Sequence, residues 1–86
     1  MKILFVLLGL LPLSAFAGAA CDAHPKSEWV PENKLKQTLV EEGYTIKKFK
    51  VDGNCYEIYG RNKEGKKVEI YFDTKTLAIV KAEVER

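Results

Sequence analysis

The sequence predicts a small α+β domain in which one helix packs on a four-stranded antiparallel β-meander. Two observations support this prediction. Apolar residues first recur at helical spacing, at Leu35 and Leu39, and after Gly43 the apolar period changes to two. Short polar segments then separate four runs of strand-forming residues. Connections this short join antiparallel hairpins, because parallel strands need long crossovers.

A helix is predicted over residues 31–42. Pro31 suits the first helical turn, where its missing N–H costs no hydrogen bond, and Gly43 suits the left-handed position that follows a helix. Leu35 and Leu39 lie about one turn apart on the same face. They form the apolar stripe available to cover one face of the sheet.

Four strands are predicted, over residues 44–51, 55–61, 66–72 and 77–84. The alternation slips between Ile46 and Phe49, which indicates a β-bulge in the first strand. The last strand has apolar residues in both phases, so the sequence leaves its inner face open.

The register of the second and third strands follows from their hairpin. A three-residue loop at 63–65, with Gly65 left-handed, places Asn62 opposite Lys66. Three apolar or glycine pairs then share one face: Gly60–Val68, Ile58–Ile70 and Tyr56–Phe72. A one-residue slip would mix the two faces, so the pattern selects this register. The opposite face, which we expect to be exposed, has the side chains of Glu57, Tyr59, Arg61, Lys67, Glu69 and Tyr71.

Residues 1–17 have the order of parts that is typical of a secretory signal peptide. Lys2 is basic, residues 3–13 are almost all apolar, and Ala15-Phe16-Ala17 is a small-x-small cleavage site. The apolar run is shorter than the roughly 20 residues that span a bilayer, which disfavours the alternative of a retained anchor. We expect a secreted, periplasmic protein cleaved near Ala17, with an irregular segment at 18–30.

Charge excludes some partners. Without Lys2 the chain has 13 basic and 12 acidic side chains, so the exported part is nearly neutral. A near-neutral domain lacks the basic surface that binds nucleic acid or anionic membranes. The sequence leaves the oligomeric state open.

Cys21 and Cys55 are the two cysteines of the chain, and both lie in the exported part. An even count in an oxidising compartment predicts a disulfide. It would stabilise so small a domain by about 3–4 kcal/mol through loop closure. Two alternatives compete: Cys21 as a lipid-modified residue, and a metal or redox-active site formed by Cys21, His24 and Cys55. The latter set is one ligand short of a closed zinc site.

No catalytic residues and no cofactor are predicted. His24 is the single histidine, and Glu57 with Glu69 is more typical of a cross-strand charge pattern than of an acid–base pair. Tyr59 and Tyr71, on the face expected to be exposed, are instead candidates for binding a protein partner, and Trp29 is the third aromatic candidate. The alternative is that the two tyrosines pack beneath the tethered N-terminal segment, against Trp29.

The chain resembles the PepSY domain family of small bacterial envelope proteins. The resemblance covers residues 29–81 and rests on packing and turn positions, which are Leu35, Leu39, Gly43, Tyr44, Tyr56, Glu57, Gly65, Glu69, Ile70, Tyr71, Phe72 and Asp73. It implies a PepSY-like domain at 31–86 that binds an envelope protein such as a peptidase, as an inhibitor or regulator, without catalysis. The family often ends its third turn with Asp-x-x-Thr-Gly, and here Leu77 replaces the glycine.

Overall fold

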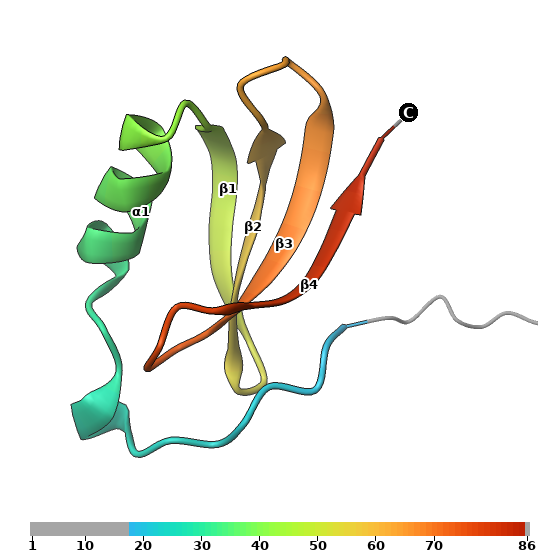
Figure 1. The fold of residues 1–86 in the computed structure, drawn as a ribbon. Coiled ribbons are helices and arrows are strands. Elements are labelled where there is room, and N and C mark those ends of the chain that lie inside the picture. Colours follow the sequence, from blue (N-terminus) through green and yellow to red (C-terminus); the bar gives the residue numbers. More distant parts are fainter. Residues whose placement is uncertain (1–17, 86) are drawn as a thin grey trace, which may run out of the picture.

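The computed structural model describes residues 18–85 and has the predicted α+β arrangement (Figure 1). Residues 1–17, predicted as a signal peptide, lie outside the described part. The elements in chain order are a 3-10 turn η2 (Lys26–Glu28), helix α1 (Glu32–Glu41), and strands β1 (Thr45–Asp52), β2 (Cys55–Arg61), β3 (Lys67–Asp73) and β4 (Ile79–Val84).

The four strands form one antiparallel sheet in the order β1-β2-β3-β4. Figure 1 shows α1 beside β1, with β4 at the opposite edge of the sheet. The segment before η2, blue in the figure, runs past the end of the sheet before the chain turns toward α1. Among the described strands, β1 and β4 are therefore the two edges.

The predicted hairpin register is confirmed. Gly60 pairs with Val68, Ile58 with Ile70, and Tyr56 with Phe72. The predicted bulge in β1 is also confirmed, because the register with β2 shifts between Ile46 and Lys48. Gly60 lies opposite this bulge, where an added Cβ would collide with the Thr45 carbonyl oxygen.

The apolar core lies between α1 and the inner face of the sheet. Leu35 and Leu39 from α1 meet the alternate inner residues of β2 and β3, as the sequence pattern requires. The buried cluster consists of Leu35, Leu39, Tyr56, Ile58, Val68, Ile70 and Phe72. This packing fixes which face of the sheet points outward.

The predicted bounds are one residue off at the end of α1 and at both ends of β1 and β3, and two other differences have a physical reason. Pro31 is the N-cap of α1, with extended backbone, and lies just before the first helical turn. The fourth strand begins at Ile79 instead of Leu77, because Leu77 has a left-handed backbone (φ 63°) that ends the turn after β3. That is the turn in which the family pattern has glycine.

The inner face of β4, which the sequence left open, is set by its register with β3. Ala82 pairs with Ile70, and Val84 pairs with Val68, both on the inner face. Between Lys81 and Ile79 the register shifts, so Val80 is an extra residue in the strand. Apolar residues in both phases are thus explained by a bulge.

Candidate functional site

The outer face of β2 and β3 brings two glutamates and two tyrosines together. Glu57 pairs with Tyr71 across the strands, and Tyr59 pairs with Glu69. The Tyr71 hydroxyl donates a hydrogen bond to Glu69 Oε2 over 2.9 Å. These four side chains are called the outer-face cluster below.

The expectation that this face is exposed is wrong for its centre. Tyr71 is 4% exposed and Glu57 is 1% exposed, whereas Tyr59 and Glu69 are half-buried. The N-terminal segment lies close by: Cys55 Sγ is 3.5 Å from the Ala19 carbonyl oxygen. The alternative prediction, packing beneath the tethered segment, therefore fits Tyr71 better than a free binding surface does.

Lysine side chains complete the cover. Lys81 Nζ donates to the Gly18 carbonyl oxygen over 3.1 Å and lies 5.9 Å from the centre of the Tyr71 ring. Lys50 Nζ lies 3.9 Å from Glu57 Oε1 and 6.0 Å from the centre of the Tyr59 ring. The two ammonium groups place positive charge beside both carboxyl groups.

The two carboxyl groups of the outer-face cluster differ in acidity. Burial raises the pKa of Glu57, and neighbouring Glu69 raises it further. The interaction with Glu57 in turn lowers the pKa of Glu69. The pKa of Tyr59 is raised chiefly by its interaction with Glu57, and that of Tyr71 chiefly by burial. Within residues 18–85 both Glu57 carboxyl oxygens are buried without a hydrogen-bond partner, which favours the protonated, neutral form of Glu57.

Trp29 lies apart from Tyr59 and Tyr71. Its ring packs edge-to-face on Tyr56, an inner-face residue, with the ring centres 5.4 Å apart. The Tyr56 hydroxyl donates to the Val30 carbonyl oxygen over 2.6 Å. The three aromatic residues predicted to bind a partner therefore do not form one continuous surface.

Cys21 and Cys55 form a disulfide, as predicted. The alternative metal site required both as free thiolates, and neither is free. A lipid on the Cys21 sulfur is incompatible with this bond as well. The disulfide fixes the N-terminal segment to the start of β2.

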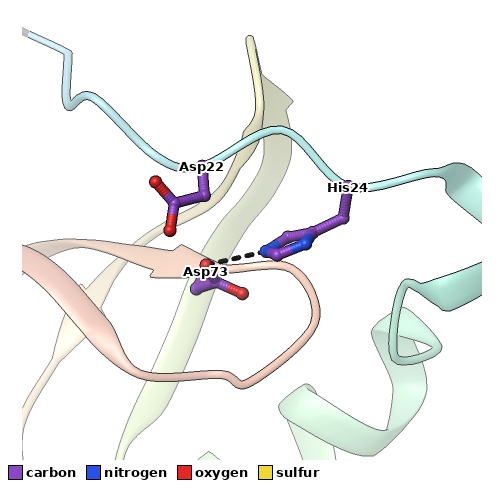
Figure 2. A group of neighbouring side chains, drawn as sticks. All are labelled: Asp22, His24 and Asp73. Atoms are coloured by element: carbon purple, nitrogen blue, oxygen red, sulfur yellow. Dashed lines mark hydrogen bonds and ion pairs between the residues drawn. The ribbon is translucent and has the colours of Figure 1, made fainter.

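His24 meets carboxylates instead of cysteines. Its Nε2 lies 3.0 Å from Asp73 Oδ2 at the end of β3, and Asp22 lies beside them (Figure 2). Asp22 and Asp73 were not predicted as neighbours of His24. A signal was present, since Cys55 pairs with Asp73 in the sheet, so a disulfide to Cys21 brings Asp22 to the same place.

Strand β4 presents an open, partly apolar edge. Ile79, Val80 and Val84 are each at least 42% exposed. Glu85 donates its backbone N–H to the Lys67 carbonyl oxygen, so in an antiparallel ladder the N–H groups of Val84 and Ala82 point away from β3. Within the described residues, this edge combines unpaired strand backbone with exposed apolar side chains.

The comparison with family models matches residues 1–83 to the PepSY family described as peptidase propeptide and YPEB domain. The chain belongs to the PepSY family. No curated protein and no solved structure matches it. PepSY domains are generally non-catalytic propeptide or inhibitory modules, typically extracellular or associated with the cell envelope.

In the part of the chain that the structure describes, no helix has the length and apolar character needed to cross a bilayer.

Proposed function

We propose that this PepSY domain is a secreted, non-catalytic module that binds an envelope peptidase and inhibits or regulates it. The main support is the family match, which covers nearly the whole chain and describes a peptidase propeptide domain. A propeptide-like module acts by occupying a surface of the enzyme, and for that it needs a rigid surface and no catalytic groups of its own.

The edge of β4 is the surface we favour for this contact. An extended segment of the peptidase would add to the sheet as a fifth strand, with main-chain hydrogen bonds to Ala82 and Val84. The exposed side chains of Ile79 and Val84 would supply the apolar contact. A strand edge of this kind is otherwise a liability for a soluble protein.

The opposite edge is less suited to strand addition. β1 contains a bulge and the three lysines Lys47, Lys48 and Lys50, which are the features that protect an edge from pairing. In β4 the bulge is confined to Val80, which leaves residues 81–84 regular.

Tyr59 provides a second contact in this proposal. It keeps exposed surface on the outer face, whereas Tyr71 is covered. A partner strand along β4 would be separated from Tyr59 on β2 by both β3 and β4, so the tyrosine would contribute only to a partner that wraps onto the outer face. Trp29 faces the other side and would take no part in the same contact.

The test is capture of peptidases from an envelope extract on the oxidised protein, followed by inhibition assays with each captured enzyme. Ala82→Pro removes an outward N–H without removing a hydrogen bond to β3, and Ala82→Ser is the matched control. We expect a peptidase that binds and is inhibited by the wild type and by Ala82→Ser, and that is lost on Ala82→Pro. Tyr59→Ala, assayed alongside, would weaken binding less.

Two results would contradict the proposal. If no captured protein is a peptidase, or captured peptidases keep full activity, the peptidase-binding role is wrong. If a peptidase binds Ala82→Pro as well as the wild type, the role stands but β4 is the wrong surface.

Export is the remaining part of the proposal. Cleavage near Ala17 would leave Gly18 as the first residue of a periplasmic domain. N-terminal sequencing and intact mass of the protein from the periplasmic fraction check this. A protein that retains Met1 and stays in the cytoplasm would contradict it.

A further inference from the structure

The N-terminal segment and the end of β3 bring three side chains of metal-ligating type together. One ligand atom from each of Asp22, His24 and Asp73 lies within 4.8 Å of the other two. Figure 2 shows the three side chains gathered where the segment passes the end of β3. We propose that this group binds one divalent cation of the Zn²⁺ type and thereby fastens the segment to the turn after β3.

Asp73 is already oriented for this role. Its Oδ1 accepts the backbone N–H groups of Lys75 and Thr76, over 2.8 and 2.9 Å, which leaves Oδ2 facing His24. These two backbone N–H groups hold the carboxylate in place and would serve as outer-shell partners of a metal ligand.

The segment that contributes the other two ligands is anchored on both sides. The Trp29 indole N–H donates to the His24 carbonyl oxygen over 2.9 Å. The disulfide holds Cys21, directly before Asp22. Binding an ion would thus order little additional chain, and a site held by its surroundings loses little affinity to conformational entropy.

The donor set selects the class of ion. One imidazole nitrogen with two carboxylates suits Zn²⁺ and similar transition metals, whereas Ca²⁺ takes six to eight oxygens and Mg²⁺ takes an octahedron of oxygens. Asp22 is exposed and His24 is half-buried, so water could fill the remaining coordination position. These ligands differ from the set Cys21, His24 and Cys55 that the sequence offered as an alternative, with which they share only His24.

Asp22 distinguishes a metal site from a simple ion pair. The contact between His24 and Asp73 is a sufficient structural reason for those two residues. It gives no role to Asp22, whose side chain makes no hydrogen bond or ion pair within residues 18–85. Asp22→Asn removes a metal ligand and leaves the His24–Asp73 contact in place.

The experiment titrates ZnCl₂ into the oxidised protein, with any affinity tag removed, by calorimetry and proton NMR. His24 is the only histidine of the chain, so its ring protons report on this site alone. We expect one Zn²⁺ per chain, shifted His24 ring signals, and binding at least about tenfold weaker in Asp22→Asn. Glu28→Gln is the matched control: it removes an acid of the same segment, paired with Lys75, and should bind Zn²⁺ like the wild type.

The proposal is overturned by any of three results. The first is no saturable binding of Zn²⁺. The second is binding that leaves the His24 ring signals unchanged. The third is equal affinity in the wild type and Asp22→Asn, which would reduce the group to an ion pair. Ca²⁺ and Mg²⁺, titrated in parallel, should compete poorly, and equal binding of Ca²⁺ would contradict the assigned class of ion.

Discussion

Leu77 has a left-handed backbone, with φ of 63°, at the end of the turn after β3. A side chain in this conformation costs roughly 1–2 kcal/mol, which glycine avoids. Leu77 also packs partly against the core, so replacing it removes apolar contact as well. We expect Leu77→Gly to be more stable than Leu77→Ala by about 1 kcal/mol, because both lose the same contacts but only glycine relieves the backbone. Urea denaturation of both variants checks this, and a more stable alanine variant would contradict it.

Glu57 should make stability depend on pH. Its raised pKa means that the unfolded chain loses this proton at a lower pH than the folded protein does. The contribution of Glu57 to the free energy of unfolding is fully present below the ordinary pKa of 4.5. It is lost as pH rises through the pKa of Glu57 in the folded protein. Glu57→Gln has a similar shape and stays neutral over the whole pH range. The wild type loses this contribution as pH rises and the variant does not. The difference in melting temperature, Glu57→Gln minus wild type, should therefore increase from pH 4.5 to pH 8. A constant difference over that range would show that Glu57 titrates normally.

At the scale of elements, the bulge in β1 explains a glycine that the sequence pattern does not. Gly60 is the last residue of β2 on its apolar face, at a buried position where a side chain would normally be favoured. A Cβ there would collide with the Thr45 carbonyl oxygen, so Gly60→Ala should cost about 1–3 kcal/mol through overpacking. Gly53→Ala, in an open turn with positive φ, is the control and should cost about 1 kcal/mol. Urea denaturation measures both losses in free energy of unfolding. If Gly60→Ala loses no more than Gly53→Ala, β1 moves away from the added methyl group at little cost.

The elements that the sequence could predict are those fixed by local pattern. The β2–β3 register followed from one glycine-ended loop and two alternating strands, and it matches the structure pair by pair. The burial of Tyr71 and Glu57 could not follow from strand alternation. Lys81, which lies over the Tyr71 ring, and the N-terminal segment that it and Cys55 contact are far from these residues in the sequence. The neighbours of His24 were hidden for the same reason. They become visible only when the disulfide and the β2–β3 register are combined.

At the scale of the whole molecule, the disulfide is the covalent link between the N-terminal segment and the sheet. It ties the N-terminal segment to β2, and the His24–Asp73 contact and the hydrogen bond from Val30 N–H to the Thr74 carbonyl oxygen continue the attachment toward α1. Removing the disulfide should detach the N-terminal segment from the sheet, beginning at Gly18. The core between the sheet and α1 should stay folded, because the core cluster contains no residue before Trp29.

The double variant Cys21→Ser/Cys55→Ser tests this expectation. It should lose about 3–4 kcal/mol of unfolding free energy in urea, the loop-closure contribution of a ring of this size. Amide hydrogen exchange should rise first in residues 18–24, while the β2–β3 amides stay protected relative to global unfolding. Because Lys81, which lies over the Tyr71 ring, is bonded to Gly18 of this segment, the pH dependence assigned to Glu57 should shrink in the same variant. A loss below about 1 kcal/mol with unchanged exchange would mean that the ion pair and backbone contacts hold the segment without the disulfide.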